Sequence, residues 1–461
     1  MIRQSIEDIT KACGGKMIQR GLEEWVKGIS TDSRSIEKNS LFIPLIGERF
    51  DGHDFLETAV KNGVSAILYE KGKNIVRETF KDIYIIEVEN TLAALQDISK
   101  YYRNLFDIPI VAITGSTGKT STKDMVSSVL SSKYNVLKNI GNLNNHIGLP
   151  LTLFNLDTHH EMAVLEMGMS GFGEILKLTE IARPTLAVIT NIGLAHIEHL
   201  GSRENIMKAK MEIANDLDSD DYLILNGDND LLKTLKFQKS NYKKIFFGLE
   251  PTNDIYPKNL INLREEGFTF DINIDGKDCS FRIKQPGIHN VYNALVAIGI
   301  GRQNKIEVEA IAKSLLNYTP SKMRMEVIEH QHIKIINDAY NASPDSMEAA
   351  LSVLVNMKGD RKIAVLGDMF EMGEFSEKGH RIVGACAVDK TDILITVGKH
   401  AKWIAEEAVS QGFKKQVYIT TTNQEAIEIL NNIIKNNDVI LVKGSRGMAM
   451  EEIVDRLQER S

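Results

Sequence analysis

Residues 110–122 read IVAITGSTGKTST, and this stretch decides the fold of the chain around it. An apolar run typical of a buried strand leads into a glycine-containing loop, and a helical pattern begins directly afterwards. Glycines let backbone N–H groups turn inward around phosphate oxygens, the helix N-terminus adds partial positive charge, and the lysine adds a full charge. Thr120 is placed to reach Mg²⁺. The predicted phosphate-binding residues are Gly115, Ser116, Thr117, Gly118, Lys119, Thr120 and Ser121.

This loop is a shorter variant of the usual phosphate loop. The strict pattern GxxxxGK[ST] would place glycine at position 113, where this chain has Ile113. A glycine turn with an incidental Lys-Thr pair is the structural alternative, which the strand–loop–helix context disfavours. The loop alone leaves four functions open: a hydrolase, a kinase, a ligase and a nucleotide switch.

Alternating strand-like and helix-like segments extend outward from the loop. The apolar runs IPIVAIT (108–114), MAVLEMG (162–168) and TLAVITNIG (185–193) are separated by helical patterns, which predicts βαβ units and a mostly parallel sheet. The segment 268–283 alternates apolar and polar residues around Asp275-Gly276 and predicts a β-hairpin. A second alternating series after Pro320 predicts an open, Rossmann-like sheet, in which ligands bind beyond the carboxyl ends of the strands.

The chain is too long for one ordinary domain. The first hundred residues mix short strands and helices, and a helix-like segment from Thr91 to Leu105 leads into Pro109. We expect an α/β protein of three domains. These are an N-terminal α/β domain at 1–106, a central phosphate-loop, mononucleotide-binding α/β domain at 107–319 and a C-terminal Rossmann-like α/β domain at 320–461.

Composition excludes several classes of function. The net charge is −7 and no basic stripe is present, so no nucleic-acid partner is expected. No signal-like segment or long uncharged apolar stretch occurs, which predicts a cytoplasmic protein without membrane insertion. The three cysteines show neither zinc nor disulfide spacing. We expect a monomer that acts on small molecules.

Three side chains outside the loop are candidates for a metal site. Glu166 follows an apolar run and precedes a glycine turn, and His196 also follows a strand-like run; Mg²⁺ prefers oxygen ligands, and His196 could add a nitrogen ligand for a second ion. Taken singly, each residue is more typical of a solvated or ordinary buried position. Lys210 lies in a helical pattern where a solvated face is the ordinary interpretation.

Nine segments, in order, resemble the Mur ligase family over nearly the whole chain. They are TGSTGKTSTK (114–123), GNLNNHIGLP (141–150), LEMGMSGFGEI (165–175), TNIGLAHIEHLGS (190–202), AKMEI (209–213), GIHNVYNALVA (287–297), NDAYNASPDSM (337–347), GDMFEMGEFSEKGH (367–380) and KGSRGMAMEEIV (443–454). TDSR (31–34) and LFIPLIGERFDGHDF (41–55) resemble the uridine-nucleotide-binding domain of the same enzymes.

The resemblance implies roles that the residue pattern alone does not. Lys119, Lys210 and His196 would be catalytic, and Thr120, Glu166, His196 and Lys210 would hold two Mg²⁺ ions, with Lys210 carbamylated. The implied ATP contacts beyond the loop are Asn293, Arg324, Asp338 and Tyr340. The implied contacts to the UDP-linked substrate are Asn144 and Asn145, with Ser33 and Arg34 at its uridine end. Arg446 is a candidate for a substrate carboxylate, which a guanidinium contacts in bidentate fashion.

GDMFEMGE and KGSRGMAME are most similar to the branch of the family that adds D-alanyl-D-alanine. The resemblance therefore implies a ligase that uses ATP and Mg²⁺ to join D-alanyl-D-alanine to UDP-N-acetylmuramoyl-tripeptide through an acyl phosphate. One alternative is a sister ligase that adds a single amino acid. The other is a nucleotide-binding switch, which would have no need of Glu166, His196 and Lys210 together.

Overall fold

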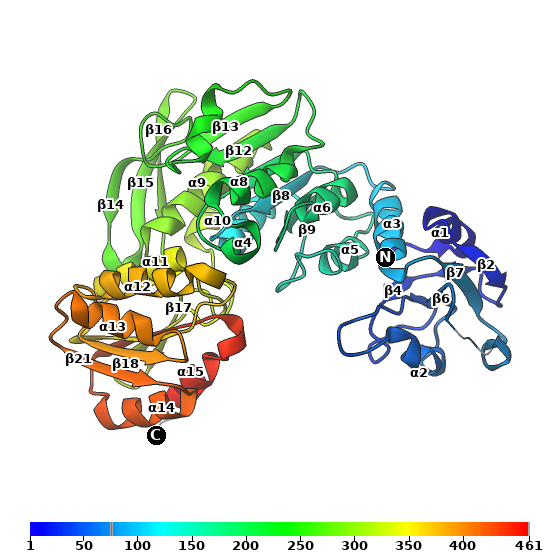
Figure 1. Ribbon diagram of the computed structural model, residues 1–461. Helices are drawn as coiled ribbons and strands as arrows, with labels where there is room; N and C mark the ends of the chain where they lie inside the picture. Colours follow the sequence, from blue (N-terminus) through cyan, green and yellow to red (C-terminus); the bar gives the residue numbers. More distant parts are fainter. Residues whose placement is uncertain (74, 76, 460–461) are drawn as a thin grey trace.

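The computed structural model describes residues 1–73, 75 and 77–459. It contains three α/β lobes joined in chain order (Figure 1). The N-terminal and C-terminal lobes lie at opposite ends of the central lobe, and in this view they do not meet. The expected three-domain α/β architecture is thereby confirmed.

The N-terminal lobe is built on a five-stranded sheet with the order β2-β7-β6-β5-β4. Only β2 and β7 run antiparallel within it. The strands are β2 (Lys16–Gln19), β4 (Gly28–Ser30), β5 (Ser40–Phe42), β6 (Ala66–Glu70) and β7 (Tyr84–Val88), and a small pair is formed by β1 (Gln4–Ser5) and β3 (Trp25–Val26). The helices are α1 (Ile6–Ala12), η1 (Gly52–Phe55), α2 (Leu56–Lys61), η2 (Arg77–Phe80) and α3 (Thr91–Arg103).

Helix α3 joins this lobe to the central lobe, and Arg103 at its end forms hydrogen bonds across the junction. The guanidinium donates to the carbonyl oxygens of Ala182 at 2.8 Å, Phe106 at 2.6 Å and Ile108 at 3.0 Å. Burial lowers the pKa of Arg103 to about 10, so the group stays charged at neutral pH. A single side chain therefore satisfies three backbone acceptors at the junction between the lobes.

Replacing Arg103 with alanine is expected to lower the free energy of unfolding by about 3 kcal/mol, because buried carbonyls would lose their donors. In calorimetry, the unfolding midpoint should fall by roughly 5 °C. Lys100→Ala, an exposed lysine one turn earlier in α3, is the matched control and should change the midpoint little. Equal midpoints for the two variants would contradict this role for Arg103.

The central lobe contains a six-stranded sheet with the order β13-β12-β11-β8-β10-β9, and every pair in it is parallel. This confirms the predicted parallel sheet. The phosphate-loop strand β8 lies between β10 and β11, and all its residues are buried, as expected for a strand covered on both faces. The strands are β8 (Ile110–Thr114), β9 (Val136–Lys138), β10 (Met162–Glu166), β11 (Leu186–Ile189), β12 (Tyr222–Asn226) and β13 (Lys243–Phe247).

Helices cover both faces of this sheet, and α4 packs closely against α9. The helices are α4 (Lys119–Leu130), α5 (Gly148–Leu153), α6 (Glu174–Ala182), α7 (Ile197–Leu200), α8 (Arg203–Met211), η3 (Glu212–Ala214), η4 (Leu232–Phe237), η5 (Arg264–Glu266), α9 (Ile288–Gln303) and α10 (Val308–Leu316). The predicted hairpin is confirmed as β15 (Phe268–Ile274) and β16 (Lys277–Ile283), and β14 (Lys258–Asn262) adds an unpredicted third strand.

The C-terminal lobe has a second six-stranded sheet with the order β17-β18-β22-β19-β20-β21. The Rossmann-like interpretation is confirmed for its five parallel strands, while β17 is an antiparallel edge strand that the sequence pattern did not predict. The strands are β17 (Glu326–His330), β18 (Ile333–Asn337), β19 (Arg361–Gly367), β20 (Ile393–Val397), β21 (Gln416–Thr420) and β22 (Asp438–Lys443). The helices are α11 (Pro344–Asn356), η6 (Gly373–Phe375), α12 (Ser376–Ala387), α13 (Lys402–Ser410), α14 (Asn423–Ile433), η7 (Arg446–Met448) and α15 (Glu451–Gln458).

Polar contacts hold the C-terminal lobe on the central lobe. Glu265 in η5 accepts from Lys334 Nζ at 2.7 Å and from the backbone N–H of Lys358 at 3.1 Å. On the other side of the junction, Asp345 accepts from the backbone N–H of Leu194 at 3.1 Å. The C-terminal lobe is thus held both beside the β14–β16 sheet, at Glu265, and near the carboxyl end of β11, at Leu194.

Candidate active site

The phosphate loop has a conformation that requires glycine at two positions. Gly115 has φ 150°, and a Cβ there would lie 1.8 Å from Thr190 Oγ1, so no side chain fits. Gly118 has φ 79° and precedes the first residue of α4. Lys119 Nζ donates to the carbonyl oxygen of Gly115 at 2.8 Å, which curls the lysine back over the loop. The backbone N–H groups at the start of α4 therefore face the space that a phosphate needs.

Residues following β11 support the loop from the neighbouring strand, and the sequence did not identify them. Thr190 Oγ1 donates to the carbonyl oxygen of Thr117 at 2.6 Å. Asn191 accepts from the Thr117 N–H at 2.9 Å and donates to Thr117 Oγ1 at 2.6 Å. Further along the loop, Ser116 Oγ accepts from the Gly193 N–H at 2.9 Å. The one sequence feature that could have identified these residues is their position directly after a predicted strand.

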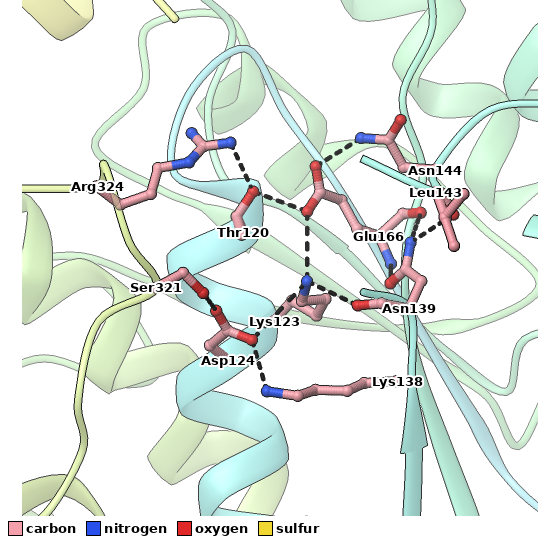
Figure 2. A network of polar contacts seen from close by, with 10 residues as sticks. All are labelled: Thr120, Lys123, Asp124, Lys138, Asn139, Leu143, Asn144, Glu166, Ser321 and Arg324. Atoms are coloured by element: carbon pink, nitrogen blue, oxygen red, sulfur yellow. Dashed lines mark hydrogen bonds and ion pairs between the residues drawn. The ribbon is translucent and has the colours of Figure 1, made fainter. Parts of the chain in front are cut away.

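Glu166 lies at the end of β10 and is 2% exposed (Figure 2). Thr120 Oγ1 donates to its Oε2 at 2.8 Å, and Asn144 Nδ2 donates to its Oε1 at 2.7 Å. Lys123 Nζ lies 3.9 Å from Oε2 and supplies a buried countercharge. Asn139 fixes the backbone of Glu166 through bonds of 2.9 and 3.1 Å. The carboxylate is thus held beside the phosphate loop, and Lys123 and Asn139 are supporting residues that the sequence analysis missed.

His196 enters the site from the beginning of α7, with a left-handed backbone at φ 65°. Its Nδ1 lies 2.6 Å from Glu371 Oε2, a carboxylate from the C-terminal lobe. Burial lowers the pKa of His196, although Glu371 acts in the opposite direction. With Nδ1 facing Glu371, Nε2 is the ring nitrogen suited to a metal ligand, in the way that a carboxylate orients histidines at metal sites.

Lys210 is 1% exposed, and among the described residues no carboxylate forms an ion pair with it. Burial, followed by the charge of Lys119, lowers the pKa of Lys210 well below its ordinary value. Lys119 also interacts electrostatically with Glu166, and His196 with both lysines. Lys119 and His196 follow β8 and β11, and together with Lys210 from α8 they lie close enough for their charges to influence one another.

The C-terminal lobe and α9 bring further predicted residues to α4, the helix that follows the phosphate loop. Arg324 Nη2 donates to Thr120 Oγ1 at 3.0 Å, and its guanidinium lies 3.9 Å from the ring centroid of Tyr340. Asn293 is buried, accepts from Thr122 Oγ1 at 2.9 Å and lies beside Gly118. Asp338 accepts from Lys443 Nζ at 2.6 Å and from the N–H of Met325 at 3.1 Å, so it stabilises the segment that carries Arg324.

Other predicted binding residues make different contacts. Asn145 Oδ1 accepts from the N–H of Gly148 at 2.8 Å and caps the start of α5, next to Asn144. Arg446 pairs with Glu451 at 2.5 Å in the C-terminal lobe. Ser33 and Arg34 follow β4 in the N-terminal lobe, where Arg34 pairs with Asp32 at 2.8 Å. Ser121 lies in the first turn of α4 and is half-buried.

The donor set fits a magnesium nucleotide. Among the described residues, no group of three or more His, Cys, Asp or Glu side chains converges as a complete metal site. Mg²⁺ ordinarily takes one or two protein oxygens and completes its shell with phosphates and water. The Thr120 hydroxyl and the Glu166 carboxylate, next to a phosphate loop, are such a set.

Sequence models of the Mur ligase family match most of the chain. The Mur ligase middle domain matches residues 113–301, and the Mur ligase glutamate ligase domain matches residues 323–446. The model described as the Mur ligase family catalytic domain matches residues 26–103. Together these matches include all three lobes.

Relatives with one activity align with the full chain. The UDP-N-acetylmuramoyl-tripeptide--D-alanyl-D-alanine ligase of Bacillus subtilis is 42% identical over 464 aligned positions, covering 100% of this chain and 99% of the relative. The Escherichia coli enzyme of the same name is 33% identical, with the same coverage of both chains.

Solved structures agree with the sequence matches. A crystal structure of MurF from Acinetobacter baumannii has a TM-score of 0.91 at 30% identity and covers 99% of both chains. A MurF ligase from Thermotoga maritima in complex with ADP has a TM-score of 0.82 at 28% identity and covers 94% of this chain and 97% of its own.

Proposed function

This chain belongs to the Mur ligase family, and on that premise we propose that it joins D-alanyl-D-alanine to UDP-N-acetylmuramoyl-tripeptide at the expense of ATP, in peptidoglycan precursor synthesis. The observation that carries this function is end-to-end similarity to ligases of this activity. The chain is accordingly an ATP-dependent peptide ligase. The conformation of the loop at 115–121, beside Glu166, supports the use of ATP.

We further propose how the lobes divide the work. Residues 1–106 would bind the UDP-linked substrate, with Ser33 and Arg34 at the uridine end. Residues 107–319 would bind ATP, and residues 320–461 would form the C-terminal ligase domain, which closes on the nucleotide. Contacts between the C-terminal lobe and α4 support this division, because they bring Arg324 to the phosphate-loop helix.

The proposed chemistry activates the terminal carboxylate of the tripeptide as an acyl phosphate. Lys119 and the N–H groups at the start of α4 would bind the phosphates of ATP and orient the γ-phosphoryl group toward that carboxylate. The amine of D-alanyl-D-alanine would then attack the acyl carbon, and phosphate would leave. Arg446 would contact a substrate carboxylate, and Asn144 and Asn145 the muramoyl-peptide substrate.

Thr120 and Glu166 would hold one Mg²⁺, and His196 and Lys210 would help to hold a second, so that the ions neutralise phosphate charge. Lys210 would first need to become a carbamate. A neutral amine is the form that reacts with CO₂, and the burial of Lys210 without a carboxylate partner among the described residues favours that neutral form. Carbamylation would convert the buried amine of Lys210 into a group with oxygen atoms that can bind the metal.

The setting of the enzyme is also part of the proposal. The described residues contain no helix long and apolar enough to cross a membrane. All three cysteines, Cys13, Cys279 and Cys386, are free, which is typical of a reducing compartment. Since ATP is the co-substrate, we propose a cytoplasmic monomer whose partners are its small-molecule substrates, with no nucleic acid.

The function is tested by phosphate release from ATP in the presence of UDP-N-acetylmuramoyl-tripeptide, with and without D-alanyl-D-alanine, while the mass of the product is followed. We expect release that requires both substrates and a product heavier by one dipeptide. Single amino acids that replace the dipeptide would instead identify a sister ligase. Nucleotide binding without turnover would identify a switch, and either result would overturn the proposal.

A further inference from the structure

The linker between the central and C-terminal lobes runs beside α4 and touches it at two points (Figure 2). Ser321 Oγ donates to Asp124 Oδ2 at 2.6 Å, and Arg324 Nη2 donates to Thr120 Oγ1 at 3.0 Å. Thr120 and Asp124 are four residues apart and lie on the same face of the helix, one turn from each other. The linker therefore meets α4 in a fixed register, with the Ser321 contact one turn behind the Arg324 contact.

Asp124, which accepts the hydrogen bond from Ser321, is buried and held in place by two lysines. Its side chain is 7% exposed, and its Oδ1 accepts from Lys138 Nζ at 2.8 Å and lies 3.8 Å from Lys123 Nζ. Burial alone would raise the pKa of Asp124, yet Lys123, Lys138 and Ser321 together hold that pKa below its ordinary value. The carboxylate is consequently ionised, and a short hydroxyl–carboxylate hydrogen bond of this kind is among the stronger ones in proteins.

The same group of charges reaches the candidate metal carboxylate. Lys123 is buried, donates to the carbonyl oxygen of Asn139 at 3.0 Å and lies between Asp124 and Glu166. Figure 2 shows the continuous chain of contacts from Ser321 through Asp124 and Lys123 to Glu166. The linker is thereby attached to buried groups of the candidate nucleotide site.

We infer that the Ser321–Asp124 hydrogen bond is a positioning device that sets Arg324 against the ATP site. Ser321 and Asp124 are positioning residues, because they act through Arg324 and touch α4 behind the phosphate loop. Without the bond, the segment carrying Arg324 would still be tethered to the C-terminal lobe by Met325 and Asp338, but only the Arg324–Thr120 contact would hold its register on α4. This inference rests on the proposed use of ATP at α4.

The test is nucleotide binding by the full chain, measured by titration calorimetry with ADP and with a non-hydrolysable ATP analogue. Ser321→Ala removes one hydroxyl and leaves Asp124 paired with Lys138. We expect its Kd for the nucleotide to rise by up to about tenfold, because the arrangement that binds nucleotide would lose the hydrogen bond to a charged group that favours it. Ser321→Thr keeps a hydroxyl and should retain most of the affinity.

The matched control is Ser314→Ala, because that hydroxyl bonds only to the carbonyl oxygen of Ala310 in its own helix. Its nucleotide Kd should stay within about twofold of the unaltered protein. If the role of Ser321 were purely structural, Ser321→Ala would lower the melting temperature of the protein without raising its Kd for the nucleotide. An unchanged Kd for Ser321→Ala would overturn the inference.

A double-mutant cycle with Arg324→Ala gives the second criterion. If Ser321 acts through Arg324, adding Ser321→Ala to Arg324→Ala should raise the Kd by less than about twofold, because the two losses are not independent. Fully additive losses would contradict a positioning role. Binding is measured without the muramoyl substrate, so a chain that binds nucleotide in this manner but fails to ligate would refute the proposed reaction and leave this inference standing.

Discussion

Lys210→Ala is expected to lower kcat by about 1,000-fold or more, because the site would lose a charged ligand group at the reacting phosphate. The side chain is almost fully buried, and its removal leaves a space lined by the remaining site residues. Formate or acetate added to the assay should enter that space and partly restore turnover, as a carboxylate in place of the carbamate. Turnover is measured as phosphate release in the complete reaction.

Lys208→Ala is the matched control for this variant, because Lys208 is an exposed lysine on the same helix, α8. It should retain the activity of the unaltered enzyme. The carbamate itself is tested by carbon NMR after incubation with labelled bicarbonate, where the unaltered protein should show a carbamate signal that Lys210→Ala lacks. Normal activity of Lys210→Ala would exclude this lysine from the reaction.

Glu166→Gln is expected to lower kcat by about 100-fold or more and to shift the Mg²⁺ requirement to higher concentrations. The amide keeps the size of the side chain but removes its negative charge. In the unaltered protein that charge lies against the Thr120 hydroxyl and Lys123. Magnesium titrations of phosphate release separate the two effects, since a lower metal affinity is recovered at high Mg²⁺ while a lower kcat is not.

Glu180→Gln serves as the control, because Glu180 is partly exposed and, among the described residues, forms an ion pair with Lys177 alone. Its Mg²⁺ dependence should be that of the unaltered enzyme. The thermal unfolding midpoints of both variants show whether the protein stays folded when buried Lys123 loses the charge of Glu166. A Glu166→Gln enzyme with an unchanged magnesium profile would show that this carboxylate does not hold the metal.

The sequence predicted the parts of the fold whose signal is local. The apolar runs at 110–114 and 162–166 indicated buried parallel strands, and Asp275-Gly276 indicated the hairpin. Edge strands were missed because their signal is weaker: β17 has no fully buried residue and no regular alternation of apolar and polar residues, and its pairing with β18 depends on the fold. The domain boundaries at 106/107 and 319/320 stay predictions.

The site was predictable where a residue type has an evident chemical use. The loop lysine, Thr120 and Glu166 stand at strand ends in the sequence, and the structure brings them together. Lys123 and Asp124 were not identified, because charged residues in a helical pattern are ordinarily solvent-exposed. Glu371 was missed as the partner of His196, since that contact exists only when the C-terminal lobe lies on the central one.

Glu265 shows what such lobe contacts mean for equilibrium binding. It lies in η5 and holds Lys334 and the backbone of Lys358, away from the phosphate-loop helix. A nucleotide that contacts both lobes favours the docked arrangement, and linkage requires docking to favour the nucleotide by the same factor. If ATP contacts both lobes, as proposed, the Glu265–Lys334 ion pair would contribute to its affinity without touching it, and added salt, which weakens such pairs, would weaken nucleotide binding.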